Sequence, residues 1–170
     1  MNHDIYGIDK EHAHPRALAL LPEEFFWDCM DELAPFGSEA GETALVGFRD
    51  WRNTHGNAPM MQRMKEVIES VGKIELSEYT EALTDRDLLI RQKEDPAFDD
   101  EQCIFTLDTS IIATAFGQLV DEGTIDADIK PLVLIAIERQ IAWAQLSESW
   151  SYAEQHIGYL NILSGVLEQA

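Results

Sequence analysis

The stretch from Ile129 to Leu146, which reads IKPLVLIAIERQIAWAQL, constrains the fold of this chain more than any other segment. Its apolar residues occupy two neighbouring faces at helical spacing, and only Glu138, Arg139 and two glutamines interrupt the apolar surface. A helix that is apolar nearly all round lies in the middle of a bundle, where other helices cover it. We therefore expect an all-α fold organised around a central apolar helix near 129–147.

Proline, glycine and serine divide the rest of the chain into further helical segments with short connections. Short connections suit antiparallel neighbours, so we expect a single acidic domain over residues 1–170, a bundle of about six to eight helices. Residues 1–14 are polar and are expected to be loosely ordered. Between residues 77 and 93 the pattern fits either one long helix or two shorter ones. The clearest remaining helical patterns cover Pro15–Leu21, Glu39–Gly56, Pro59–Gly72, Glu101–Glu122 and a last helix that Ser149 or Ser151 is expected to cap.

The charge balance limits the class of partner. The chain has 32 Asp and Glu residues against 12 Lys and Arg residues, which gives a formal net charge of −20. Proteins that bind DNA, RNA or anionic membranes need basic residues to neutralise phosphates, so these partners are not expected. A strongly acidic surface favours a cationic partner, and it also keeps a protein soluble without any partner.

The cysteines and the hydropathy pattern predict a cytoplasmic protein. Cys29 and Cys103 lie far apart beside apolar residues and have no metal-ligand spacing, so we expect reduced thiols in or near the core. The first residues have neither a basic start nor an apolar core region, and no signal peptide is expected. No apolar run approaches the roughly 18 residues of a membrane span, so none is expected either.

No residue set predicts a catalytic, cofactor or metal site directly. His12 and His14, with Asp9 and Glu11 nearby, offer metal-ligating groups, but residues two apart do not share a helix face. A turn before Pro15 explains these histidines better. The alternative that stays open is a metal-dependent enzyme that uses His12, His14 and a nearby carboxylate, and the carboxylates nominated for that role are Asp28 and Asp31.

Two acidic segments are the candidate partner-binding surface. Carboxylates surround the aromatic run Phe25–Trp27, of which we expect at least two rings in the core; a second group lies in the loop before residue 101. That loop lacks the alternating ligands and central glycine of a calcium loop, and acidic residues at a helix start explain it equally well. Complementary charge sets the rate and specificity of association, and aromatic anchors supply affinity. The predicted binding residues are Asp28, Asp31, Glu32, Glu39, Glu42, Asp95, Asp99 and Asp100.

The first quarter of the chain resembles a known family. FFWDCMDELAPFGSEAGETALVGFRDWR, from Phe25 to Arg52, together with the upstream HPRALALLPE, from His14 to Glu23, is similar to the YfeS-like family of small acidic bacterial proteins. Members of that family can occur beside WGR domains, and the family has no assigned reaction. The resemblance implies a bacterial cytoplasmic protein with a structurally important turn at Pro35–Gly41, and it supplies no catalytic residues.

These observations favour a non-enzymatic protein that binds a basic protein partner. The sharpest form of this hypothesis is an immunity or antitoxin-type protein that neutralises a cationic toxin by covering its active cleft. The alternatives are the metal-dependent enzyme described above and a regulatory partner of another bacterial protein. The sequence predicts neither the identity of the partner nor the oligomeric state.

Overall fold

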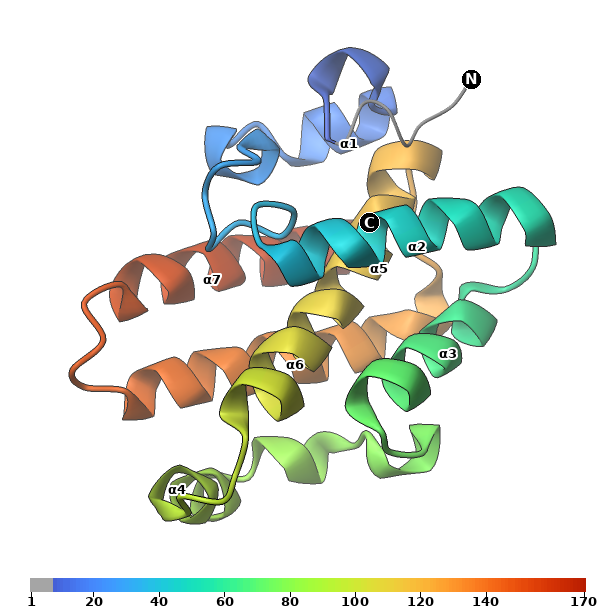
Figure 1. Cartoon of the computed structure of the whole chain (residues 1–170). Coiled ribbons are helices and arrows are strands. Elements are labelled where there is room, and N and C mark those ends of the chain that lie inside the picture. Colours follow the sequence, from blue (N-terminus) through green and yellow to red (C-terminus); the bar gives the residue numbers. More distant parts are fainter. Residues whose placement is uncertain (1–7) are drawn as a thin grey trace.

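The computed structural model describes residues 8–170, which contain seven α-helices, connecting segments with 3-10 turns, and no β-strand (Figure 1). The predicted all-helical bundle is therefore confirmed. Most of the predicted helix ends lie within one or two residues of the observed ends. The helices are α1 (Pro15–Leu20), α2 (Glu39–His55), α3 (Met60–Gly72), α4 (Arg86–Glu94), α5 (Leu107–Glu122), α6 (Lys130–Leu146) and α7 (Ala153–Gln169).

Helix α5 occupies the centre of the bundle, where α2, α3 and α6 pack against it. From Leu107 to Val120 every residue except Thr109 is buried. The central helix is thus α5 and not the helix near 129–147, because one side of α6 is exposed. Its exposed residues recur at helical spacing, and two of them, Pro131 and Leu134, are apolar; Leu134 is 38% exposed.

The segment Glu101–Glu122 is long and apolar enough to cross a membrane by length and composition alone. In the fold, 78% of its most apolar window is buried, as in the core helix of a soluble protein. Its first turn, Glu101–Thr106, has π-helical geometry and continues directly into α5. The predicted helix is thus present over its whole length, with a wider first turn.

Local sequence signals set several other boundaries. The Ser38 hydroxyl accepts a hydrogen bond from the Gly41 N–H and caps α2. The open question at residues 77–93 is resolved by two 3-10 turns, Leu76–Glu78 and Glu81–Thr84, which precede the separate helix α4. The last helix begins after Tyr152 and has no side-chain cap, so the expected serine cap was wrong.

A buried ion pair joins the two core helices α5 and α6. The Asp108 carboxylate, 0% exposed, accepts two hydrogen bonds from the Arg139 guanidinium at 2.7 and 2.8 Å. The Tyr79 hydroxyl donates a third at 2.6 Å, and burial raises the pKa of Tyr79 well above its ordinary value, so this hydroxyl keeps its proton. Arg139 also donates to the Cys103 carbonyl at 2.9 Å. The network therefore connects both helices to the π-helical turn.

Gly123 ends α5 in the left-handed conformation, with φ of 80°. A Cβ atom at this position would also collide with the ring of His14, whose Nδ1 accepts from the Arg16 N–H and caps α1. We expect Gly123→Ala to lower the free energy of unfolding by about 1–2 kcal/mol in urea denaturation.

The matched control for this change is Gly165→Ala, an exposed position inside α7 where a new Cβ meets no atom within 4 Å. Alanine is the better helix former, so this variant is expected to be as stable as the parent or up to about 1 kcal/mol more stable. Equal stability of the two variants would show that the conformation at Gly123 carries no cost.

Candidate functional site

A cleft of about 880 Å³ opens between several parts of the bundle, including Val71 of α3 and Lys93 of α4. Most of its walls come from the turn before α2 and the first residues of that helix, the π-helical turn with the start of α5, the end of α6, and the loop and first turns of α7. Hollows of this size that mix apolar walls with a few polar groups are the usual places for ligands and partner side chains. We therefore take this hollow, called the α5–α7 cleft below, as the candidate site.

Three aromatic rings line the cleft. Phe105 and Trp150 meet edge to face with ring centroids 6.3 Å apart, and Trp143 lies on the neighbouring wall. The Lys93 ammonium lies 4.6 Å from the centroid of the Trp143 ring and donates to the Ser147 hydroxyl at 2.6 Å. A cation is thus already held over one aromatic face of the cleft by the protein itself.

His156 is the most unusual group in the cleft. Its residue exposure is 7%, and neither ring nitrogen has a hydrogen-bond partner within residues 8–170. Burial lowers the pKa of His156 from 6.5 to about 4, so the ring is neutral at pH 7 and offers one donor and one acceptor. The Trp150 ring lies beside it with centroids 5.3 Å apart. A buried polar group without a hydrogen-bond partner lowers the stability of the folded state, so its presence in a native structure requires an explanation.

Carboxylates from both predicted acidic segments meet at this cleft. Glu32 and Glu39 line it from the turn before α2 and from the first turn of α2, whereas Asp100 and Glu101 line it from the residue before the π-helical turn and from the start of that turn. Lys93 is the one basic residue among the described residues that line it. The cleft therefore combines a neutral buried histidine, aromatic walls and an excess of negative charge. We refer to the four carboxylates of Glu32, Glu39, Asp100 and Glu101 as the cleft acids.

The other predicted binding residues lie elsewhere. Asp28 and Asp31 line a second, smaller hollow of about 480 Å³, where the Tyr159 hydroxyl donates to Asp31 at 2.6 Å and the Tyr159 ring stacks on Phe25 at 3.9 Å. Of the aromatic run, Phe26 is fully buried while Phe25 and Trp27 are half-buried against the core. The remaining three predicted residues, Glu42, Asp95 and Asp99, line neither hollow.

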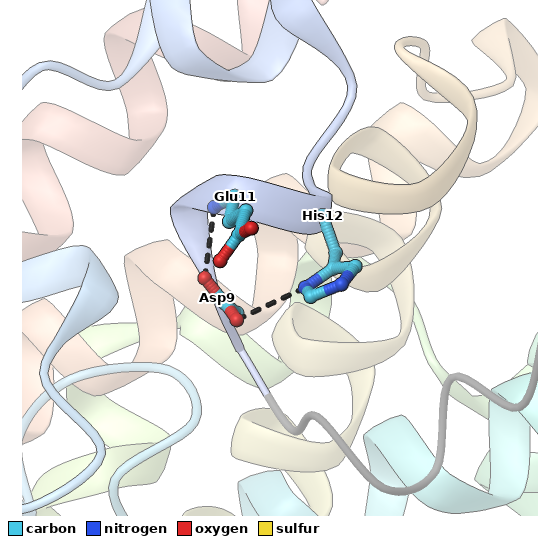
Figure 2. A group of neighbouring side chains, drawn as sticks. All are labelled: Asp9, Glu11 and His12. Carbon is cyan, nitrogen blue, oxygen red and sulfur yellow. Dashed lines mark hydrogen bonds and ion pairs between the residues drawn. The ribbon is translucent and has the colours of Figure 1, made fainter.

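The N-terminal histidines do not form the pair that the metal alternative needs. Figure 2 shows Asp9, Glu11 and His12, whose potential ligand atoms lie within 4.8 Å of one another. His14 is not in that group, because its ring caps α1. One Asp9 oxygen accepts from the Glu11 N–H at 2.8 Å and the other lies 3.0 Å from the His12 Nδ1. Both oxygens therefore stabilise the 3-10 turn Lys10–His12, as expected for a turn before Pro15.

The acidic loop also uses its carboxylates locally. Asp95 accepts from the Ala97 N–H at 2.9 Å, and Asp99 accepts from the Gln102 N–H at 3.2 Å. Cys29 and Cys103 are both free, but Cys29 is exposed, so its expected place in or near the core was wrong. It lies in the turns after the short 3-10 helix, where the chain runs along the surface.

Sequence reasoning missed the aromatic and histidine residues of the cleft. One usable signal was Trp150, a large aromatic residue in the polar loop SESWSY. Because tryptophan is highly buried on average, its presence in a polar loop indicates that its ring packs against another part of the protein. His156 follows it by nearly two helical turns, and the sequence offered it no partner.

Comparison of the chain with protein-family models, with curated proteins and with solved structures finds no match. The resemblance to the YfeS-like family stays a prediction.

Proposed function

We propose that this protein is a non-enzymatic binding protein that captures a basic protein partner through the α5–α7 cleft. In its sharpest form it is a bacterial cytoplasmic immunity or antitoxin-type protein that neutralises a cationic toxin. The observation that carries the proposal is the convergence of two acidic segments, distant in the sequence, around one aromatic cleft. Aromatic anchors inside a rim of complementary charge are the arrangement that specific protein interfaces use.

The overall charge supports the same proposal. A net charge of −20 attracts cationic proteins from a distance and speeds their encounter, whereas the cleft acids act at the point of contact. His156 does not provide the pairing that a serine–histidine enzyme needs. Since His156 has no hydrogen-bond partner among the described residues, no serine or threonine of the cleft is activated by it in this structure.

The test is a pull-down from a bacterial lysate with tagged protein at low and at moderate salt, which compares the parent with two triple variants. The cleft variant carries Glu32→Gln, Glu39→Gln and Asp100→Asn. We expect the parent to retain one stoichiometric basic protein at moderate salt and the cleft variant to retain about tenfold less. These side chains are exposed or half-buried, so the fold should survive, which circular dichroism can check.

The matched control removes the same charge away from both hollows, with Asp87→Asn, Glu138→Gln and Glu168→Gln, all exposed. It should retain the partner as the parent does at moderate salt, because distant surface charges are screened. Equal losses in the two triple variants would show that net charge alone governs retention and that the cleft is not the binding site.

A further inference from the structure

The starting point is the incomplete hydrogen bonding of His156. Of the buried side-chain nitrogen and oxygen atoms without a partner, two are the ring nitrogens of this one residue. The residue lines an open cleft, and both ring nitrogens lie beneath the surface of that wall, so a donor that enters meets them when the covering side chains shift. Leaving a buried polar group unpaired costs free energy, and a ligand that supplies the missing hydrogen bonds recovers that cost.

The charged groups that line the cleft determine which sign of charge a ligand should carry. The four cleft acids are negative, and Lys93 is the single positive group, already engaged with Ser147 and the Trp143 ring. A neutral imidazole has an acceptor nitrogen for a donor on the ligand. An anion would meet four carboxylates and no free cation among these residues, so a cationic donor is the ligand chemistry that fits.

The aromatic walls decide between the two cationic side chains. A guanidinium group is planar, stacks on aromatic faces and donates up to five hydrogen bonds in a fixed fork, whereas an ammonium group is a compact and strongly hydrated charge. Trp150 lies beside the His156 ring and Phe105 packs against Trp150, while Lys93 covers the Trp143 face. A planar cation on an apolar stem uses the rings, the imidazole acceptor and the cleft acids together.

We infer that the α5–α7 cleft is a receptor for an arginine side chain of the basic partner, with its guanidinium group at the aromatic wall and His156 as a hydrogen-bond acceptor. This inference rests on the proposed function, because it names the group through which the partner is anchored. A side chain within a peptide carries no free carboxylate, so the cleft acids attract it without the opposing repulsion that free arginine would meet.

The probe that tests this inference is N-acetyl-arginine N-methylamide, titrated into the full chain while the tryptophan and histidine signals are followed by NMR. A single side chain is a small ligand, so we expect a Kd on the order of 1 mM. The neutral citrulline analogue has almost the same shape without the charge, and it should bind at least about tenfold more weakly. The lysine analogue should also bind more weakly, because it lacks the planar fork.

Two variants locate the site. His156→Leu should weaken binding of the arginine probe about tenfold, the effect of one lost hydrogen bond to a charged group. The matched control is His55→Leu, an exposed histidine outside the cleft, which should leave binding unchanged. Equal binding of the arginine and citrulline probes, or unchanged binding in His156→Leu, overturns the inference. Tighter binding of free L-arginine than of the blocked probe overturns it as well, since the occupant is then a small molecule.

The two proposals can fail separately. If a basic protein is captured through the cleft acids but the arginine probe shows no preference over citrulline, the proposed function stands and the arginine anchor is wrong. If the arginine probe binds with the expected preference and dependence on His156 but no protein depends on the cleft acids, the proposed function fails. In that case the cleft still binds a guanidinium group, but the binding of a basic protein partner through the cleft is wrong.

Discussion

Replacing Arg139 with alanine is expected to lower the free energy of unfolding by about 4 kcal/mol, because a buried carboxylate loses its counter-charge. Arg139 is 3% exposed and Asp108 is 0% exposed, so water cannot take the place of the guanidinium group. The Tyr79 hydroxyl remains as the one donor to Asp108 among the hydrogen bonds described here. Urea unfolding at pH 7, followed by circular dichroism, measures the loss.

Two comparisons separate the ion pair from other effects of the change. Arg91→Ala removes an exposed arginine from α4 and should change stability by less than about 0.5 kcal/mol. The triple variant Tyr79→Phe, Asp108→Leu and Arg139→Met replaces the whole network with apolar groups, and it should recover most of the loss, because buried pairs contribute little net stability. A loss below about 1 kcal/mol in Arg139→Ala would show that the buried charge is relieved in another way.

The same network supports the cleft. Arg139 donates to the Cys103 carbonyl in the π-helical turn, and this turn carries Phe105 and Glu101 into the cleft wall. Loss of the guanidinium group therefore removes a contact that positions one wall of the candidate site. In Arg139→Ala we expect weaker binding of the arginine probe under conditions where the chain is still folded.

The all-helical fold could be predicted because the residue types at the ends of each helix determine where the helix begins and ends. Ser38 at the start of α2 and Gly123 at the end of α5 act within a few residues of their own positions. Which helix lies in the centre could not be predicted this way. In the sequence, the apolar Leu134 indicates that the outer side of α6 is buried, although it is exposed. The polar residues Asp108 and Gln118 indicate that one side of α5 is exposed, although both are buried.

Those polar residues of α5 are buried because partners from elsewhere in the chain satisfy them. Gln118 exchanges hydrogen bonds with Asp126 at 2.8 and 2.9 Å, and Asp108 pairs with Arg139. The candidate site depended on the same kind of long-range contact. Local charge pointed to Glu32, Glu39 and Asp100, but only the packing of α2, α5 and α7 brings them to one cleft with His156. Asp28 and Asp31, equally acidic in the sequence, lie at another hollow.

His156→Leu is expected to make the protein more stable while it weakens binding. Leucine has a similar size and leaves no polar atom unpaired, so we expect the free energy of unfolding at pH 7 to rise by about 2 kcal/mol. A residue kept only for packing would show the opposite sign. A gain in stability coupled to a loss of binding is the behaviour of a group retained for function.

The pH dependence gives this prediction a second, independent measurement. Because burial lowers the pKa of His156 from 6.5 to about 4, the unfolded chain takes up a proton at this residue before the folded chain does. Its contribution to stability is therefore constant above pH 6.5, falls as the pH falls from 6.5 to 4, and levels off below that, a total change of about 3 kcal/mol. The advantage of His156→Leu over the parent should grow across this window, while His55→Leu should follow the parent. A difference between His156→Leu and the parent that does not vary with pH would mean that His156 titrates alike in both states, and that its ring is hydrated in the folded protein.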